Sequence, residues 1–323
     1  MHKLPVGVLG ASGYAGRELC LLVRQHPQLE LVFAAAHGQR GQTVRIAGTD
    51  LTFIGNDDAP LGDAALVFSA MPHGASIEWV ERARSAGPKV VDLSSDLRPG
   101  HARTDKLGTA PYGLTELARA EVAGADLVSN PGCYPTAILL ALAPLAKAGL
   151  LEKDTTVTVN AASGVTGAGY SAKPELLFAE ISEDFRAYAV GNNHRHLIEM
   201  RSVLEELGST VDVVFTPHLL PVARGILATI VVRVNSTLDD PLAPWQAAYA
   251  DEPFIEVTRT TPALHDVVRR NNVVISAAHA ENTKSPTLII TSAIDNLTKG
   301  AAGQAVQNAN LMLGLDETLG LPR

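Results

Sequence analysis

The sequence Pro5-Val6-Gly7-Val8-Leu9-Gly10-Ala11-Ser12-Gly13-Tyr14-Ala15-Gly16 decides the fold of the N-terminal half. Its apolar start predicts a strand, its glycines predict a tight turn, and the leucine-rich residues from Arg17 to Gln25 predict a helix. Glycines let a backbone approach a pyrophosphate, and a helix N-terminus attracts negative charge. A plain turn is the alternative, because the spacing is G-x-x-G-x-x-G and not the commoner G-x-G-x-x-G. The dinucleotide prediction covers Gly10, Ser12, Gly13, Tyr14, Ala15 and Gly16.

Strand and helix patterns alternate beyond this turn. Apolar strands are predicted at residues 29–35, 65–69 and 89–93, and a helix at residues 77–85. This alternation is typical of a parallel, doubly wound α/β sheet of the Rossmann type, which binds ligands at the carboxyl ends of its strands. The segments after two of these strands therefore predict cofactor contacts at Pro72, His73 and Gly74 and a substrate anion contact at Arg98. A surface salt bridge is the alternative for Arg98.

The end of the second predicted strand bears on the choice of cofactor. Folds that select NAD usually place a carboxylate there to hold the ribose hydroxyls. Residues 36–40 contain no carboxylate, and Arg40 could instead pair with a 2′-phosphate. We therefore expect NADP(H), with a solvated loop arginine as the alternative for Arg40.

The second half of the chain has a different pattern. Strands are predicted at residues 211–216, 226–234, 273–278 and 287–294 without regularly intervening helices, which favours an α+β domain with a mixed or antiparallel sheet. A length of 323 residues also fits two domains. We place a nucleotide-binding domain at 1–132 and a second, sheet-rich domain at 133–296.

The octet Ser129-Asn130-Pro131-Gly132-Cys133-Tyr134-Pro135-Thr136 stands where these domains meet in the sequence. Proline suits the first turn of a helix, so Pro135 predicts a helix that begins near Cys133. A thiol at a helix N-terminus has a lowered pKa, and the thiolate is the nucleophile. A small buried hydrophobic residue is the alternative for Cys133.

Three further segments supply candidate site residues. The loop Ser163–Gly169 follows a predicted strand and could hold an anion or acyl group, unless it is a flexible linker. His194 or His196 could be the acid/base partner of Cys133, unless both are structural. Asn296 precedes the last predicted helix and could return to the cofactor. No cysteine or acid cluster accompanies the two histidines, so we expect no metal.

The composition excludes several classes of function. A net charge of −8 does not favour binding to nucleic acid or to anionic membranes. Two cysteines cannot form a disulfide framework, so we expect a reducing compartment and a cytoplasmic location. The apolar N-terminus is broken by Pro5 and Gly7, so a first strand is expected there and not a signal peptide.

Five motifs occur in an order typical of a known family. They are Gly10–Gly16, Ser129–Thr136, Ser163–Gly169, His194-Arg195-His196 and Asp295–Gly300. Together they resemble the N-acetyl-gamma-glutamyl-phosphate reductases of arginine biosynthesis, which are related to aspartate-semialdehyde dehydrogenases. The resemblance implies that the C-terminal helix, 297–323, completes the Rossmann domain and that residues 133–296 form a catalytic, dimerisation domain. It also implies that Cys133 is the nucleophile and that a histidine of the 194–196 segment is the acid/base, His194 before His196.

The function that follows is reduction of an acyl phosphate by NADPH through a cysteine thioester. The expected substrate is N-acetyl-gamma-glutamyl phosphate, and the expected products are N-acetylglutamate semialdehyde and phosphate. Further contacts to the cofactor are expected at Ser163 and Gly164. Contacts to the substrate are expected at Asn130, Arg98 and Gly167. The alternatives are the same chemistry on a carrier-linked aminoadipyl phosphate of lysine biosynthesis, or a non-catalytic protein that senses NADP. The sheet-rich second domain favours a homo-oligomer, a dimer or tetramer.

Overall fold

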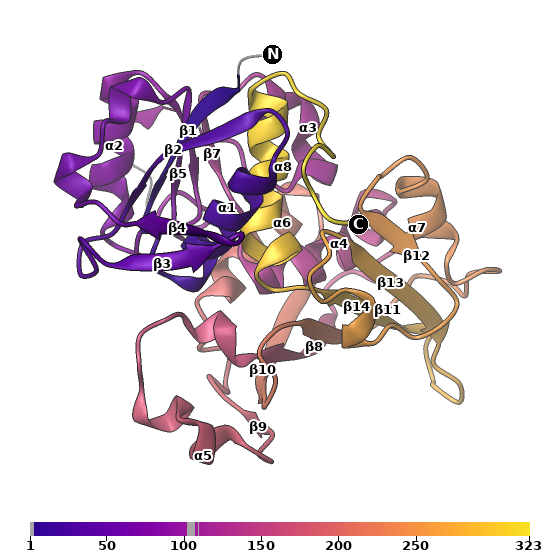
Figure 1. Cartoon of the computed structure of the whole chain (residues 1–323). Coiled ribbons are helices and arrows are strands. Elements are labelled where there is room, and N and C mark those ends of the chain that lie inside the picture. Colours follow the sequence, from indigo (N-terminus) through magenta and orange to yellow (C-terminus); the bar gives the residue numbers. More distant parts are fainter. Residues whose placement is uncertain (1–2, 102–106, 109) are drawn as a thin grey trace. The chain divides into compact units, whose positions relative to one another are not determined.

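The computed structural model describes residues 3–101, 107–108 and 110–323, and the chain divides into two compact units. The first unit lies within residues 1–132 and 301–322, and the second within residues 133–300 together with Arg323. The first therefore takes in both ends of the colour range in Figure 1, from the indigo strands to the yellow helix α8.

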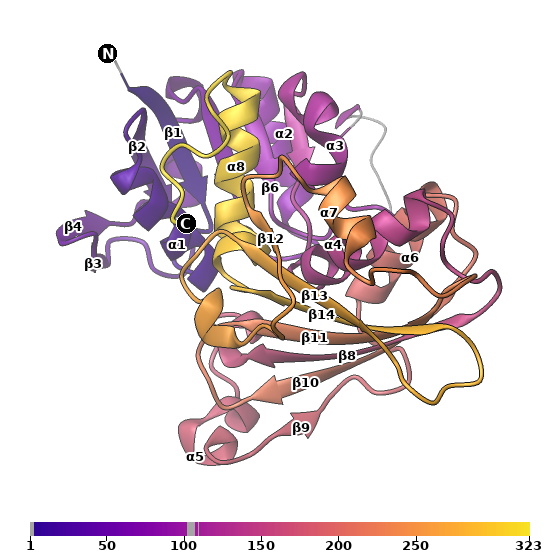
Figure 2. The ribbon, with the colours of Figure 1, turned by 90° about the vertical axis from the view of Figure 1, so that its right-hand side faces the viewer.

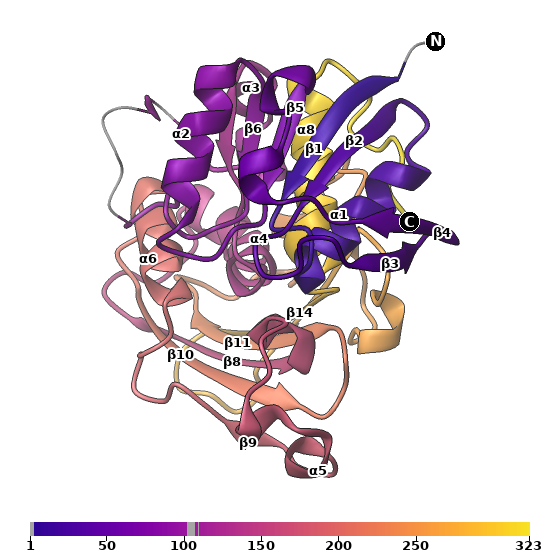
Figure 3. The ribbon, with the colours of Figure 1, turned by 60° about the vertical axis from the view of Figure 1, so that its left-hand side comes forward.

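A five-stranded parallel sheet forms the centre of the first unit, in the order β2-β1-β5-β6-β7. Its strands are β1 (Leu4–Leu9), β2 (Leu29–Ala35), β5 (Leu66–Ser69), β6 (Lys89–Asp92) and β7 (Leu127–Ser129). Four of them can be followed side by side in Figure 3. Because β1 lies between β2 and β5, the chain winds away from β1 in both directions, and the predicted doubly wound sheet is confirmed.

Among the residues described in this unit, four α-helices pack, and one of them comes from the other end of the chain. They are α1 (Tyr14–Gln25), α2 (Ser76–Ala86), α3 (Thr115–Ala123) and α8 (Gly303–Met312). Helix α8 contacts α1, α3 and β6. A small antiparallel hairpin, formed by β3 (Thr43–Ile46) and β4 (Thr49–Thr52), was not predicted. Its residues are mostly polar and exposed, so they lack a clear strand pattern.

A seven-stranded mixed sheet forms the second unit, in the order β12-β13-β14-β11-β8-β10-β9. Its strands are β8 (Thr156–Gly164), β9 (Arg186–Ala187), β10 (Asp212–Leu220), β11 (Ile226–Arg233), β12 (Ile255–Val257), β13 (Val273–His279) and β14 (Thr287–Ile294). The pairs β8–β10 and β12–β13 are parallel and the others antiparallel, so the predicted mixed sheet is confirmed.

Helices cover one face of this mixed sheet, as Figure 2 shows for α4, α6 and α7. The helices of the unit are α4 (Cys133–Lys147), α5 (Phe178–Ile181), α6 (His196–Glu206) and α7 (Ala243–Ala248). Inward residues of β11 are buried in alternation with more exposed ones, as expected for a sheet with one covered face. Strand β10 extends to Leu220, whereas the predicted strand ended at Thr216. Pro217 does not end the strand, because the residues after it still pair with β8.

Helix α4 is the core of the second unit, since every residue from Tyr134 to Ala146 is buried. Pro144 lies inside it and has no N–H to donate to the carbonyl of Leu140. The Tyr249 hydroxyl donates to that carbonyl at 2.7 Å, and the Trp245 indole N–H donates to the neighbouring Ala141 carbonyl at 2.9 Å. Helix α7 and the residue after it therefore supply donors where the proline interrupts the helix.

The glycines of the first turn have distinct packing reasons. Gly10 has a φ of +72°, and a Cβ there would lie 2.3 Å from the Ala70 carbonyl oxygen after β5. A Cβ on Gly16 would lie 2.3 Å from the Gly10 carbonyl oxygen and 2.7 Å from the Ala11 Cα. Among the described residues, the atom nearest to a Cβ on Gly13 is the Gly10 carbonyl oxygen, at 3.8 Å. Close packing thus requires glycine at positions 10 and 16, whereas position 13 has room.

We expect Gly16→Ala to lower the free energy of unfolding by about 2 kcal/mol or more, because the backbone of the turn would have to move away from α1. Gly13→Ala is the matched control, and its effect should stay within about 1 kcal/mol since its φ of −71° suits alanine. Urea denaturation of the two variants checks this. Equal stability of both would show that the turn has no tight contact at Gly16.

Candidate active site

Cys133 is the first residue of α4 and is half-buried. The free N–H groups at a helix N-terminus stabilise negative charge, which favours a thiolate there. The segment 295–300 lies against this residue, since a Cβ on Gly300 would come within 2.8 Å of the Cys133 Cβ. Only a glycine at position 300 leaves space for the cysteine in this geometry.

Two tyrosines lie close to Cys133. The hydroxyls of Tyr134 and Tyr188 are 3.0 Å apart, and Tyr134 is only 2% exposed. Burial raises the pKa of the Tyr134 phenol. Burial also raises the pKa of Tyr188 to about 12, and a charge on the nearby Cys133 acts in the same direction. Both phenols are therefore protonated near neutral pH.

His194 borders this pair of tyrosines, just before α6. Its ring centroid lies 5.4 Å from that of Tyr134 and 5.9 Å from that of Tyr188. Burial, with a smaller contribution from the Arg195 charge, lowers the pKa of His194 to about 4. Its Nδ1 accepts a hydrogen bond from the His196 backbone N–H at 3.2 Å, so the neutral ring carries its proton on Nε2.

His196 is the more buried of the two histidines, at 5% exposure, and begins α6. Its ring centroid is 4.8 Å from that of His194. The two predicted acid/base candidates thus lie together, and the half-buried His194 is the more accessible one.

The glycine-rich loop after β8 is a short 3₁₀ turn, Val165–Ala168, and not an extended linker. Ser163 and Gly164 end the strand and are buried, whereas Gly167 is exposed. A Cβ on Gly167 would lie 3.1 Å from the Ser163 Oγ and 3.8 Å from the Asn296 Nδ2. The structure therefore brings Asn296 next to the loop of Ser163, Gly164 and Gly167, from which the sequence separates it widely.

Asn296 connects this loop to the segment beside Cys133. Its Nδ2 donates to the Thr166 Oγ1 at 2.9 Å, and its Oδ1 accepts from the Gly225 backbone N–H at 2.7 Å. With 2% of its surface exposed and both polar atoms bonded, Asn296 has a tethering role in this geometry.

A largely buried ion pair, which no pattern in the sequence indicated, holds the segment 295–300. The Arg224 guanidinium donates from Nε to Asp295 Oδ2 at 2.8 Å and from Nη2 to Oδ1 at 3.1 Å. Asp295 also accepts backbone N–H groups from Leu297, Thr298 and Arg269. The carboxylate thereby fixes the segment whose glycine lies against Cys133.

In the first unit, the loops that follow β5 and β6 are linked to each other. The Ser95 backbone N–H donates to His73 Nδ1 at 2.8 Å, and the Gly74 backbone N–H donates to both oxygens of Asp96 at 2.9 Å. Pro72, His73 and Gly74 are exposed at the carboxyl edge of the parallel sheet, the edge that also holds Gly10. The nucleotide contacts predicted for this loop remain geometrically available.

Arg40 is exposed and forms an ion pair with Asp58, in which Nη2 lies 2.9 Å from Oδ2. Its side chain is 69% exposed, so the pair is weak and the guanidinium can exchange this partner for another anion.

The substrate contacts at Arg98 and Asn130 stay predictions, and both side chains make hydrogen bonds within the first unit. Arg98 is 4% exposed and donates from Nε to the Asn130 carbonyl at 2.9 Å and from Nη2 to the Leu93 carbonyl at 2.7 Å. Asn130 is fully buried, and its side-chain amide bonds to Ala301 and Asn308. Both residues hold the backbone of the first unit in place, because their polar atoms already bond within it.

Within the part of the chain that the structure describes, no cluster of three or more histidine, cysteine or acidic side chains could hold a metal ion. In the same residues, no helix has the length and apolar character needed to cross a membrane.

The chain matches known proteins over almost its whole length. Residues 5–125 match the semialdehyde dehydrogenase NAD-binding domain, and residues 133–296 match the semialdehyde dehydrogenase dimerisation domain. The N-acetyl-gamma-glutamyl-phosphate reductase of Geobacter sp. (strain M21) is 39% identical, over 98% of each chain. That of Afipia carboxidovorans is 43% identical, over 99% of this chain and 97% of the other.

The chain belongs to the N-acetyl-gamma-glutamyl-phosphate reductase family. The family resemblance that the motifs predicted is confirmed. The NAD-binding match also assigns a nicotinamide cofactor to the first unit.

Solved structures show the same fold as this family member. Aspartate semialdehyde dehydrogenase II from Vibrio cholerae aligns with a TM-score of 0.77 at 20% identity, covering 97% of this chain and 99% of the other. The Candida albicans aspartate semialdehyde dehydrogenase with NADP aligns with a TM-score of 0.67 at 14% identity, covering 96% and 98%. At these identities the likeness concerns the fold alone.

We expect the His194 ring to stay neutral in the folded protein down to about pH 5, because burial lowers its pKa to about 4. The unfolded chain takes up this proton near the ordinary value of 6.5, so the histidine lowers stability progressively as the pH falls from 6.5 towards 4. Titration of the ring resonances by NMR checks the pKa.

His194→Asn tests the linked effect on stability. Between about pH 7 and pH 5 the free energy of unfolding should fall less in this variant than in the parent, because the variant lacks the titrating ring. A His194 ring that titrates above pH 6 would contradict the assigned protonation state.

Proposed function

We propose that this chain reduces N-acetyl-gamma-glutamyl phosphate to N-acetylglutamate semialdehyde with release of phosphate, the activity named for its relatives. The observation that carries the proposal is the position of Cys133 at the start of a buried helix, beside protonated tyrosines that border a neutral His194. This set of groups suits acyl transfer through a thiol.

The first step uses the sulfur of Cys133. Its thiolate attacks the carbonyl carbon of the acyl phosphate, a C–S bond forms, and the C–O bond to phosphate breaks. The departing phosphate takes up the one proton that the overall reaction consumes. The N-terminus of α4 favours this step because it stabilises the thiolate before the attack.

The second step reduces the thioester. A bound nicotinamide supplies the hydride for the thioester carbon. Negative charge then develops on the former carbonyl oxygen, and His194 can donate to it from Nε2 because its Nδ1 already accepts a backbone hydrogen bond. When the C–S bond breaks, the aldehyde leaves, the proton returns to His194 and Cys133 is again a thiolate.

We propose that the nicotinamide cofactor is NADP(H). The turn at Gly13 has room for a pyrophosphate at the N-terminus of α1, since an added Cβ would meet its nearest described neighbour at 3.8 Å. No carboxylate stands at residues 36–40, and Arg40 offers a cation to a 2′-phosphate.

We also propose a homo-oligomer, a dimer or tetramer. The match of residues 133–296 to a dimerisation domain supports this, as do the exposed apolar side chains of the second unit, among which Phe178 is 81% exposed. A reducing compartment, the cytoplasm, suits the proposal because Cys133 works only as a free thiol.

The test of the function is the reverse reaction. With N-acetylglutamate semialdehyde, NADP and phosphate, the protein should form NADPH, and omission of phosphate should stop turnover. Cys133→Ser should reduce turnover by roughly a thousandfold or more while NADPH binding persists. Cys20→Ala is the matched control and should keep turnover, since burial raises the pKa of Cys20 to about 12 and keeps it unreactive.

Two outcomes would overturn the proposal. Undiminished turnover by Cys133→Ser would remove the thiol from the chemistry. Turnover of a carrier-linked aminoadipate semialdehyde, with none of N-acetylglutamate semialdehyde, would assign a different substrate.

The cofactor preference is tested at Arg40. Arg40→Gln should raise the KM for NADPH about tenfold, because the variant loses one charge-assisted hydrogen bond to the 2′-phosphate. It should change the KM for NADH by less than about twofold, because NADH has no 2′-phosphate. Arg45→Gln, an exposed arginine on β3, is the control and should change neither constant. An equal effect of Arg40→Gln on both cofactors would mean that Arg40 does not recognise the 2′-phosphate.

A further inference from the structure

Asn130 is held at both its backbone and its side chain. Its backbone N–H donates to the Asp92 carbonyl at 2.7 Å, and its carbonyl accepts from Arg98 Nε at 2.9 Å. Its side-chain Nδ2 donates to the Ala301 carbonyl at 3.2 Å, and its Oδ1 accepts from Asn308 Nδ2 at 3.0 Å. A residue held in this way has little freedom to rotate.

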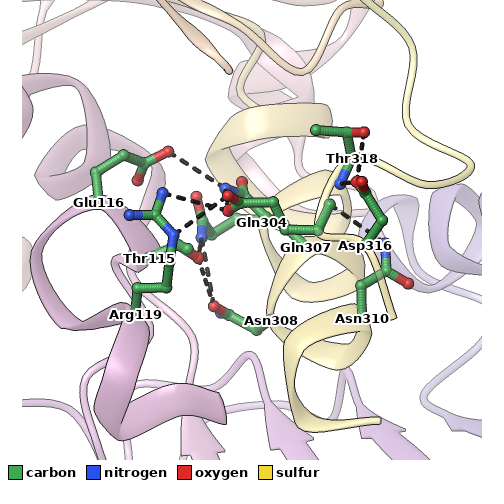
Figure 4. Close-up of polar contacts among 10 residues, drawn as sticks. Thr115, Glu116, Arg119, Gln304, Gln307, Asn308, Asn310, Asp316 and Thr318 are labelled. Carbon is green, nitrogen blue, oxygen red and sulfur yellow. Dashed lines mark hydrogen bonds and ion pairs between the residues drawn. The ribbon is translucent and has the colours of Figure 1, made fainter. Parts of the chain in front are cut away.

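Asn308 reaches Asn130 from α8, the helix supplied by the end of the chain. Its Nδ2 donates a second hydrogen bond to the Gly113 carbonyl at 2.8 Å. Its Oδ1 accepts from the Thr115 hydroxyl at 2.8 Å. Figure 4 shows Asn308 and Thr115 together with Gln304, whose amide donates to Thr115 Oγ1 at 2.7 Å. The side chain of Asn308 is thus oriented from both of its ends.

The packing around Asn308 permits this one arrangement. Asn308 is fully buried, and a Cβ on Gly113 would lie 2.4 Å from its Nδ2. The glycine at 113 is therefore what lets the amide approach. If Asn308 lost its donor, the buried Asn130 Oδ1 would lose this partner, which is costly away from water, whereas the Gly113 carbonyl would keep the bond from Gln304 Nε2 at 3.0 Å.

Asn130 is joined to Cys133 through Pro131 and Gly132, both of them buried. Pro131 has a restricted φ, so the short link from Asn130 to the first residue of α4 has few conformations. We propose that Asn308 is a positioning residue for Cys133. It holds the turn that leads into α4 and thereby keeps the Cys133 thiol in the position that favours its ionisation and its reactivity. The proposal rests on the proposed function for the use of this thiol in catalysis.

Asn308→Asp is the variant that tests the proposal. It keeps the size of the side chain and its acceptor for Thr115, and it places an oxygen opposite the Gly113 and Asn130 oxygens. Asn310→Asp is the matched control. Asn310 is also buried on α8, but its amide donates to the Glu317 and Leu319 carbonyls, away from Asn130.

The main measurement is alkylation of Cys133 by iodoacetamide as a function of pH, quantified by mass spectrometry of the peptide that contains Cys133. In Asn308→Asp the rate near pH 7 should fall roughly tenfold and the midpoint of the profile should rise, because the thiolate loses its orientation at the helix. In Asn310→Asp the profile should match that of the parent. NADPH affinity and melting temperature of the two variants show whether the effect is confined to the thiol.

This measurement needs no substrate, so it separates the proposal from the proposed function. A parent protein that alkylates rapidly but does not turn over the semialdehyde would overturn the function and leave the positioning role intact. Identical alkylation profiles in Asn308→Asp and Asn310→Asp would overturn the positioning role.

Thr115→Val covers the case in which Asn308→Asp does not fold. It removes only the hydroxyl that orients the Asn308 amide and should lower the alkylation rate in the same direction by a smaller factor. Thr318→Val, which removes an exposed hydroxyl beyond α8, is its control. An unchanged profile in a folded Thr115→Val protein would count against the proposal.

Discussion

The start of α4 at Cys133 is the constraint on which the second unit and its chemistry both depend. From Tyr134 to Ala146 the helix is buried, so the packing of the core fixes its axis. The same axis fixes where the N–H groups of its first turn point, and these groups stabilise charge on the sulfur. Core packing and reactivity are therefore not separate properties here. The break at Pro144 is tolerated because Tyr249 bonds the carbonyl of Leu140, which keeps the far end of the helix in register.

The sequence predicted the features that arise from local patterns. The apolar run before Gly10, the glycines and the leucines after Arg17 follow one another in one short stretch of sequence, so strand, turn and helix could be placed directly. Pro135 marked the first turn of α4 for the same reason. The mixed sheet followed from β-branched runs without intervening helices, as at residues 287–294. The small β3–β4 hairpin was missed because it is exposed and carries few apolar residues.

The contacts that join distant residues could not be predicted in this way. Nothing near Tyr188 indicates that its hydroxyl meets that of Tyr134, and nothing near Arg224 indicates that it pairs with Asp295. Arg98 and Asn130 show a related limit of residue type. Their residue types suit anion binding, but burial against backbone carbonyls and amides uses their polar atoms for structure. Residue type alone does not distinguish these roles, because the distinction lies in which atoms reach them after folding.

The origin of α8 at the end of the chain has a consequence for biosynthesis. During translation the strands and helices up to residue 132 leave the ribosome long before residues 303–312 are made. Until then the surfaces of α1, α3 and β6 that α8 covers remain open to water, and Gly113 and Thr115 lack their amide partners. The first unit thus cannot reach its final structure until residues 303–312 have been made. A nascent chain interrupted before α8 would expose an apolar surface, the feature by which chaperones recognise unfinished proteins.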